Sequence, residues 1–369
     1  MTKLHISFIT QFFPPVLAKN QTGGTISNIN MLRFFASRYD VTVLTFDPSS
    51  KVELFADEPF RVVQQTPPQW RAPGLVLHWQ DFVRRNTQDL FDSAGSPDIL
   101  LATTSTLAAF DVADNETKCI AVVQAFENFG FDCPWVPMGT KVDLIKGAIL
   151  RRLSDGRLLK AADGILTNSS FMCGAISQRF GIKLAQIHVL KQQVDVEPSA
   201  QMPPKDTIGF VHRGKDKNIG LVIDLARKAP GLTFRIYGHA QGIPVNLPAN
   251  VKVLGWASDR REMFASAALW LVPSLWAEPF GRVSIEAQAA NRPVLVINNG
   301  GLPETVRDTR YIIDTFDPEA WLERIRALLA LSDAQIAQAG AEIRFSFSND
   351  MHDAALQQAV DEITNASRG

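Results

Sequence analysis

The sequence has few cysteines and almost no net charge, and both shortages exclude classes of protein. Its three cysteines, Cys119, Cys133 and Cys173, lack metal-ligand spacing and are too few for a disulfide scaffold. This usage is typical of a reducing cytoplasm. The 37 Lys and Arg residues nearly balance 38 Asp and Glu residues, for a formal net charge of −1. A chain without a global positive field is a poor candidate for binding nucleic acid.

Long apolar runs and internal repeats are also missing. No run approaches the roughly 18 apolar residues of a membrane-spanning helix. Residues 4–10 are too short, and too soon followed by Pro14 and Pro15, to be a signal peptide, so we expect a soluble or peripheral protein. No repeat of about 20 to 50 residues suggests a solenoid.

What the sequence does contain is an alternation of strand-like apolar runs and helical patterns, in two series. This alternation predicts an α/β protein with two doubly wound parallel sheets, each in a Rossmann-like domain. We expect domains at 1–190 and 206–349, a proline-rich linker at 191–205 and a final helix within 350–369. The first series has strands at 4–9, 41–46, 99–102, 120–124, 164–167 and 187–190, with helices at 27–37, 75–90, 142–161 and 170–180. The second has strands at 208–212, 233–237, 251–254, 269–272, 294–297 and 311–313.

One segment, from Pro273 to Ile297, is more informative than the rest. A buried strand at 269–272 is followed by a turn containing Pro279 and Gly281, and then by a helical pattern at 283–290. A helix start beside a glycine offers unpaired amides and a favourable dipole to a phosphate group. The segment therefore predicts a phosphate site at Gly281.

Two glutamates flank this site, Glu278 before the turn and Glu286 within the helix. Glu286 lies about five residues past the helix start, or about 7.5 Å along the axis. A glycosidase needs both carboxylates on one scissile bond, whereas these lie on opposite sides of the phosphate site. They suit a ligand with hydroxyls at both ends and negative charge between them, a nucleotide sugar. Glu286 would accept from the ribose and Glu278 from the sugar; the alternative is that both merely decorate a helix start.

This pattern resembles the Glu-x7-Glu motif of retaining GT-B glycosyltransferases, the group related to glycogen synthase and bacterial mannosyltransferases. Gly300-Gly301-Leu-Pro-Glu304 also matches that group. The resemblance implies two Rossmann-like domains facing across a cleft, with the C-terminal helix crossing back to the first. It implies that the donor phosphate and sugar are held by the amides around Phe280, Gly281, Arg282 and Val283.

Loops after other strands supply further candidates, because ligands bind at the carboxyl ends of parallel strands. After the strand at 208–212, Arg213 and Lys217 match the cations that neutralise the leaving diphosphate in this family. Lys215 is the alternative to Lys217, and a solvated basic loop is the alternative to both. Gly23 and Gly24 resemble the first-domain loop that meets the donor diphosphate; they are not a Gly-x-Gly-x-x-Gly motif, which argues against a dehydrogenase. Leu254 lies where the family cradles the base.

The sequence also departs from the family. A histidine often found near the transferred sugar is replaced around Gln124, leaving Glu127 and Asn128 as candidate contacts to the sugar or acceptor. Residues 190–195, Leu-Lys-Gln-Gln-Val-Asp, stand where a Pro-Asn-Gly-Val-Asp turn is usual. No Asp-x-Asp pair is present to hold a cation. We therefore expect no metal and no other cofactor.

The resemblance implies a retaining, hexosyltransferase-like enzyme that moves a sugar from a nucleoside diphosphate sugar to a hydroxyl acceptor. The acceptor would be a saccharide, a lipid-linked glycan or a small molecule, and residues 48–97, where the resemblance is weakest, would help to shape its site. A GT-B sugar-nucleotide epimerase and a non-catalytic nucleotide-sugar-binding subunit remain open. The basic amphipathic stretch from Lys141 to Lys160 suits either peripheral contact with the inner face of a membrane or ordinary packing against the sheet.

Overall fold

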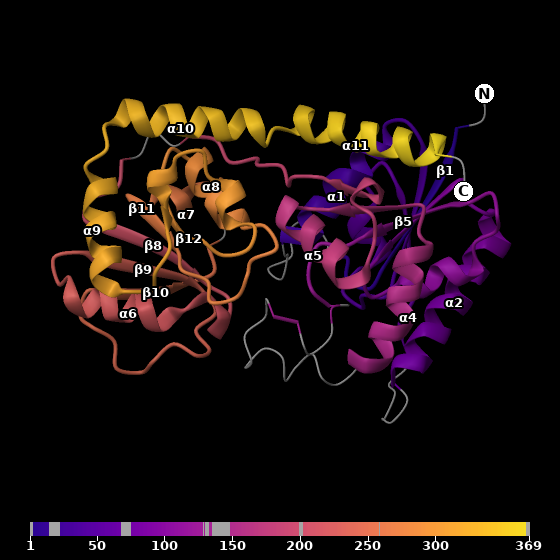
Figure 1. Ribbon diagram of the computed structural model, residues 1–369, viewed down its shortest axis with the longest axis horizontal. Helices are drawn as coiled ribbons and strands as arrows, with labels where there is room; N and C mark the ends of the chain where they lie inside the picture. The colour runs from indigo at the N-terminus through magenta and orange to yellow at the C-terminus, as the bar shows by residue number, and fades with distance from the viewer. Residues whose placement is uncertain are drawn as a thin grey trace. The chain divides into compact units, whose positions relative to one another are not determined.

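The computed structural model describes residues 3–14, 23–67, 75–127, 129, 133–134, 148–198, 202–257 and 259–366. These residues form two compact units. Among the described residues, the first contains those up to Lys191 and those from His352 onward, and the second contains Gln192–Met351. Figure 1 colours the first stretch of the chain indigo to magenta, the second unit pink to gold, and the last helix yellow.

The first unit is built on a sheet of parallel strands whose order reverses beside β1. The order is β3-β2-β1-β4-β5-β6-β7, so that β1 lies between β2 and β4. This is a doubly wound arrangement, in which loops next to the reversal are placed to bind ligands. The strands are β1 His5–Thr10, β2 Asp40–Thr45, β3 Arg61–Gln64, β4 Ile99–Thr103, β5 Lys118–Val122, β6 Gly164–Thr167 and β7 Ile187–Val189.

The edge strand β3 was not expected, because the sequence predicts no strand between residues 48 and 97. That prediction is wrong for a physical reason. β3 has only four residues and pairs with β2 alone, and Val62 is its one fully buried side chain. An edge strand that buries so little needs no apolar run, so periodicity gives little signal for it.

Helices α1 Gly23–Ala36, α2 Leu75–Ala94, α4 Ala148–Ala161 and α5 Ser170–Phe180 belong to the same unit. The ends of α5 follow directly from its sequence. The Ser169 hydroxyl accepts a hydrogen bond from the Met172 amide, and Gly181 ends the helix at φ 66°. Serine at the start and a left-handed glycine at the end are the residues that these positions favour.

The basic stretch from Lys141 to Lys160 is described from residue 148 onward, as α4. Leu158 and Leu159 are buried, and Arg157 pairs with Asp111 at 2.7 Å. For this end of the stretch the structure favours packing against the unit; residues 141–147 lie outside the described residues. Among the helices that the structure describes, none is both long and apolar enough to cross a membrane.

The second unit has its own parallel sheet, with the order β10-β9-β8-β11-β12-β13. Here too the order reverses, between β8 and β11, which pair directly. Its strands are β8 Thr207–His212, β9 Thr233–Gly238, β10 Val251–Gly255, β11 Leu269–Val272, β12 Val294–Ile297 and β13 Ile312–Ile313. Its helices are α6 Ile219–Lys228, α7 Arg260–Ala265, α8 Arg282–Ala289, α9 Pro318–Leu329 and α10 Asp333–Ser346.

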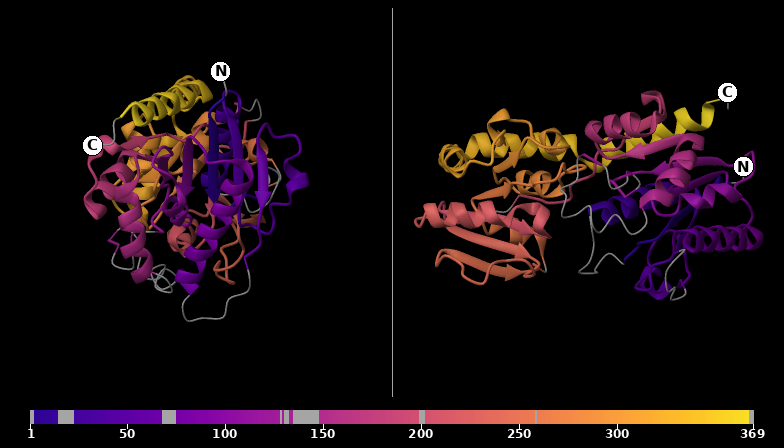
Figure 2. Two further views of the ribbon diagram at one scale, coloured as in Figure 1. Left: turned by 90° about the vertical axis from the view of Figure 1, so that its right-hand side faces the viewer. Right: turned by 60° about the horizontal axis from the view of Figure 1, so that its bottom comes forward.

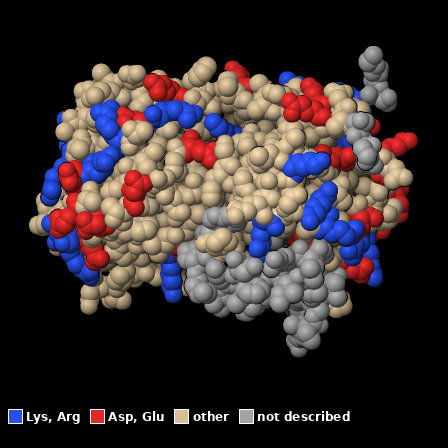
Figure 3. Space-filling view, viewed as in Figure 1, with Lys and Arg blue, Asp and Glu red and all other residues tan. Residues whose placement is uncertain are grey.

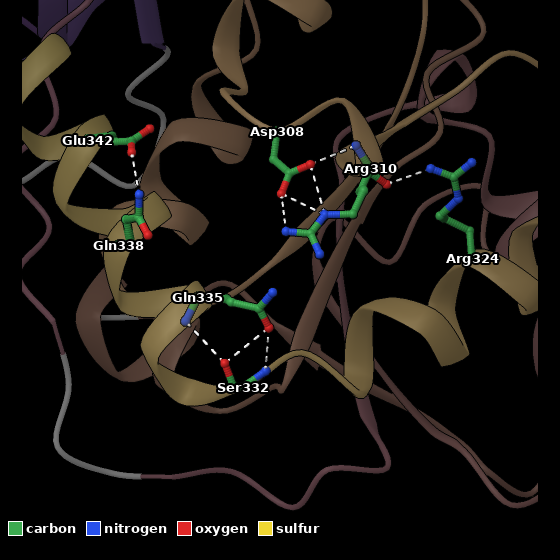
Figure 4. Close-up of polar contacts among 7 residues, drawn as sticks. All are labelled: Asp308, Arg310, Arg324, Ser332, Gln335, Gln338 and Glu342. Carbon is green, nitrogen blue, oxygen red and sulfur yellow. Dashed lines mark hydrogen bonds and ion pairs between the residues drawn. The ribbon is translucent and has the colours of Figure 1, made fainter.

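Side-chain contacts fix the turns around α10 (Figure 4). The Ser332 hydroxyl accepts from the Gln335 amide, and the Gln335 side chain accepts from the Ser332 amide, which is a complete capping box. Nearby, the Asp308 carboxylate accepts three hydrogen bonds from the guanidinium of Arg310, and the Arg310 carbonyl accepts one from Arg324 of α9. These contacts hold the chain between β12 and α10 in one path.

The last helix, α11 Asn349–Asn365, carries the chain from the second unit to the first. Leu356, Val360 and Ile363 recur at i, i+4 and i+7, and all three are buried in the core of the first unit. In Figures 1 and 2 this yellow helix lies against the indigo and magenta elements. Its apolar stripe therefore attaches the C-terminal segment to the first sheet.

Charged side chains are mixed on the face seen in Figure 3, where neither sign covers a large area by itself. The described residues include exposed ion pairs, such as Lys228 with Glu319 at 2.7 Å. Pairs of this kind stabilise a fold only slightly. The surface agrees with the balanced composition.

We predict that Gly164→Ala destabilises the first unit by about 1–3 kcal/mol, the usual range for overpacking. A Cβ at Gly164 would lie 2.3 Å from Cδ1 of Ile363, so α11 would have to shift. Urea unfolding should detect the loss, and Ile363→Val in the same chain should restore part of it. The matched control is Gly174→Ala in α5, where a Cβ meets nothing within 4 Å and should be neutral or stabilising. Equal stability of both alanine variants would contradict this packing.

Candidate functional site

The candidate site lies at the carboxyl ends of β8 and β11 in the second unit. Because these strands are adjacent and parallel, the loops that follow them meet at one edge of the sheet. The loop after β8 contains Arg213 and Lys217, and the loop after β11 contains Glu278 and leads into α8. The Lys217 ammonium contacts Oε1 of Glu278 directly. The fold thus brings together Lys217 and Glu278, which the sequence predicted from separate motifs.

Glu278 is a buried carboxylate, only 7% exposed. Burial by itself raises the pKa of this carboxyl, but the charge of Lys217, hydrogen bonds from Lys217 and Ser274, and the nearby indole of Trp276 together hold the pKa below its ordinary value of 4.5. The Ser274 hydroxyl donates to Oε1 at 2.5 Å, and the Lys217 ammonium lies 5.2 Å from the Trp276 ring centroid. Glu278 is therefore ionised at neutral pH, so that it accepts hydrogen bonds and does not act as a proton donor.

The backbone around Glu278 is fixed by glycines from the next loop. Gly300 lies so close that a Cβ there would stand 2.4 Å from the Glu278 carbonyl oxygen, and the Gly301 amide donates to that oxygen at 2.7 Å. Gly300 also has φ 66°, a left-handed conformation. The Gly-Gly pair is thus needed to bring this loop against the backbone of Glu278.

The predicted helix start is present, with α8 beginning at Arg282 after Gly281. Gly281 has φ 123°, and a Cβ there would lie 2.5 Å from Leu302 Cδ2. As the residue before the helix it has no side chain to satisfy the first amides, so these suit an anionic ligand. The side chain of Phe280 is buried against Phe347 at 5.8 Å between ring centroids, so only its backbone is available to a ligand. Val283, on the first turn, is partly buried.

Glu286 is also buried, at 4% exposed, and two guanidinium groups bind it. Arg282 Nε donates to Oε1 at 2.6 Å, and Arg260 from α7 donates to the same atom at 2.9 Å. Within the described part of the chain, the contacts of Glu286 fall on Oε1. Its orientation therefore leaves Oε2 as the acceptor for a ligand.

Arg213 completes the cluster. Burial lowers the pKa of its guanidinium, as does the nearby charge of Arg260, while Glu286 and Glu278 raise it. Its guanidinium carbon lies 4.8 Å from the ring centroid of Trp256, a cation–π arrangement. Arg213 thus lies within electrostatic reach of both glutamates. Two carboxylates share the site with four cations, Arg213, Lys217, Arg260 and Arg282, and the excess positive charge suits a diphosphate.

The remaining candidates come from other elements, apart from Lys215, which lies in the same loop as Lys217. Gly23 and Gly24 open α1 in the first unit. Glu127 is exposed and accepts from Thr104 at 3.4 Å, whereas Asn128 lies outside the described residues. Leu254, on β10, is 47% exposed, and Lys215 lies in the turn before α6. Within the described ranges, no group of three or more His, Cys, Asp or Glu side chains is placed to hold a metal ion.

Four side chains of the site were not predicted from the sequence. Ser274 and Trp276 precede Glu278 by four and two residues, a spacing that was available as a signal within the motif. Arg260 gives no such signal, because it lies 26 residues from Glu286 and reaches it only through the packing of α7 beside α8. The side chain of Arg282 was likewise not assigned a role apart from its amide.

Comparison with known proteins agrees with this geometry. Residues 193–342 match the sequence model of the family described as glycosyl transferases group 1. Among curated proteins, the chain is 28% identical over 237 residues to a D-inositol 3-phosphate glycosyltransferase of Segniliparus rotundus, covering 53% of this chain and 52% of that protein. One from Mycolicibacterium paratuberculosis is 28% identical over 257 residues, 60% of this chain and 58% of that one. The chain thus spans little more than half the length of these curated relatives.

Solved structures share the fold over nearly the whole chain. Sucrose-phosphate synthase from Thermosynechococcus elongatus has a TM-score of 0.78 at 17% identity, covering 99% of this chain and 100% of that one. Anabaena HepE in complex with UDP and glucose has a TM-score of 0.71 at 18% identity, covering 98% and 100%. With the two parallel sheets, these likenesses confirm the predicted GT-B fold class.

We predict that Lys217→Met destabilises the second unit by about 3–5 kcal/mol at neutral pH, because it leaves a buried carboxylate without its cation. In the wild type, Glu278 adds stability that is lost only as the pH falls through its lowered pKa. In the variant, burial without the Lys217 charge raises that pKa, so the loss of stability should shrink as the pH falls from neutrality toward the ordinary value of 4.5 and Glu278 becomes protonated. Melting temperatures across this range measure the effect.

The control is Lys228→Met, which removes an exposed ion pair with Glu319 and should change little at any pH. A Lys217→Met deficit that is small, or independent of pH, would contradict the ionised state of Glu278.

Proposed function

Because residues 193–342 belong to the glycosyl transferases group 1 and the chain has the GT-B fold, we propose that this protein is a retaining glycosyltransferase. It transfers a sugar from a nucleoside diphosphate sugar to a hydroxyl acceptor. The observation that carries the proposal is the convergence of Glu278, Glu286, Arg213 and Lys217 around the start of α8. This set offers cations to a diphosphate and acceptors to the hydroxyls on either side of it.

Each group has a role that follows from its surroundings. Arg213, Lys217 and the first amides of α8 stabilise the charge that develops on the leaving diphosphate. Glu278, ionised and held by Lys217, Ser274 and Trp276, accepts from hydroxyls of the transferred sugar. Glu286 accepts from the ribose. Because these groups are fixed by one another before the ligand arrives, little reorganisation is needed during the reaction.

Transfer then requires no side-chain nucleophile. The acceptor hydroxyl attacks the anomeric carbon on the face from which the diphosphate departs. The bond from that carbon to the phosphate oxygen breaks, the bond to the acceptor oxygen forms, and the acceptor proton passes to the leaving phosphate. Attack on this face retains the anomeric configuration.

The relatives suggest where to look for the substrates. One structural neighbour is in complex with UDP and glucose, so UDP is the first nucleotide to test. The curated relatives are named D-inositol 3-phosphate glycosyltransferases, which adds phosphorylated polyols to the saccharide and lipid-linked acceptors worth testing. The deciding experiment is a calorimetric screen of nucleoside diphosphates, followed by turnover assays with sugars on the preferred one. Binding without transfer would favour a partner subunit, and isomerised donor would indicate an epimerase.

We predict that Glu286→Gln and Glu278→Gln divide into two phenotypes. Losing a hydrogen bond to a charged group costs about 1.5–3 kcal/mol. Glu286→Gln should therefore weaken nucleoside diphosphate binding roughly 10- to 100-fold, and Glu278→Gln should mainly lower kcat by a similar factor. Calorimetry and initial rates measure the two quantities. If both variants keep wild-type affinity and rate, the glutamates do not hold the two ends of the donor.

We further propose that transfer needs no divalent cation, because arginine, lysine and helix amides already meet the diphosphate charge. The initial rate of sugar transfer should persist in excess EDTA, with at most a modest gain from added magnesium or manganese. A rate that EDTA abolishes and metal restores would show that carboxylates of this chain hold a cation instead.

A further inference from the structure

Arg282 connects Glu286 to residues 192–195, where the chain enters the second unit. These four residues are called the entering segment. The Arg282 Nε donates to Glu286 at 2.6 Å, one terminal nitrogen donates to the Gln193 carbonyl at 3.0 Å, and the other donates to Asp195 Oδ1 at 3.3 Å. A guanidinium group is planar, with its donors in a rigid fork. It cannot turn toward or away from one of these partners without disturbing the other two.

The entering segment is also attached to the point where the chain leaves the unit. The Val194 amide donates to the Phe347 carbonyl at 2.8 Å, only a few residues before the unit ends at Met351. Gln192 and Gln193 are buried. Residues 192–195 are therefore a structured part of the second unit, with one end of their contacts at α8 and the other at the end of α10.

We propose that Arg282 is a positioning residue through which residues 193–195 set the orientation of Glu286 toward the ribose of the bound nucleotide. The proposal rests on the proposed function, because it assigns Glu286 to the ribose. Arg260 binds the same oxygen of Glu286 but comes from α7, so it does not couple Glu286 to the entering segment. Arg282 contacts both Glu286 and residues 193–195, so it can transmit a shift of these residues to Glu286.

Asp195 provides the most selective test, because its side chain is 64% exposed and, within the described residues, makes its ion pair with Arg282. The full-length chain is titrated calorimetrically with UDP, GDP and ADP, and the tightest binder is compared with its 2′,3′-dideoxy form. Asp195→Ala should raise the Kd of the ribonucleotide roughly three- to tenfold, within the range of pairwise coupling. It should also reduce the difference in affinity between the ribonucleotide and its dideoxy form (the dideoxy gap), because that difference measures what the ribose hydroxyls contribute to binding.

The substitution should have no further effect in an Arg282→Leu background, and Asp195→Glu should recover most of the affinity. The matched control is Asp224→Ala, which removes an equally simple exposed contact to Arg227 on α6 and should leave both measurements unchanged. If Asp195→Ala acted only by lowering the general stability of the protein, Asp195→Glu would not recover the nucleotide affinity. The dideoxy gap would not change selectively either.

The outcomes separate the two proposals. If the wild type binds none of the nucleotides, the proposed function fails, and this inference fails with it. If it binds them but Asp195→Ala leaves the Kd and the dideoxy gap as in the wild type, only the role of Arg282 is overturned. Should Arg282→Leu not fold, the Asp195→Ala and Asp195→Glu pair decides the question alone.

Discussion

An ionised carboxylate that is removed from water costs several kcal/mol unless cations and hydrogen-bond donors replace the lost hydration. The second unit contains two such carboxylates at the edge of one sheet, Glu278 and Glu286. Lys217, Ser274 and Trp276 compensate the first, while Arg260 and Arg282 compensate the second. These partners come from the loops after β8 and β11 and from the starts of α7 and α8. Their contacts with the two carboxylates therefore hold these four segments together.

The same compensation prepares the site for an anion. Cations that neutralise buried glutamates remain close to the helix start at Gly281, so the diphosphate proposed to bind there would meet positive charge that the fold has already positioned. Glycine is needed where backbones approach closely, as at Gly300 against Glu278. Stability and ligand binding thus depend on the same small set of contacts, and a substitution in this cluster should affect both.

Local patterns were sufficient for most of the fold and for the centre of the site. Apolar runs predicted the strands of both sheets apart from β3, and the strand-turn-helix pattern around Gly281 predicted the start of α8. Arg260 and the side-chain role of Arg282 could not be found this way. Their partners are Glu286, Gln193 and Asp195, and except for the Arg282–Glu286 pair within α8 these contacts join residues 26 to 89 positions apart. Sequence spacing carries no information about contacts that only tertiary packing creates.

The central claim is that the diphosphate departs and the acceptor attacks on the same face, with no side chain acting as nucleophile. Proton NMR of the newly formed glycosidic linkage tests it most directly, using a donor of known anomeric configuration. With attack on the face from which the diphosphate departs, the product should have the configuration of the donor, with the anomeric coupling constant of the same anomer. A product of the opposite configuration would contradict it, and would mean that the residues around Gly281 place the acceptor on the far side of the sugar.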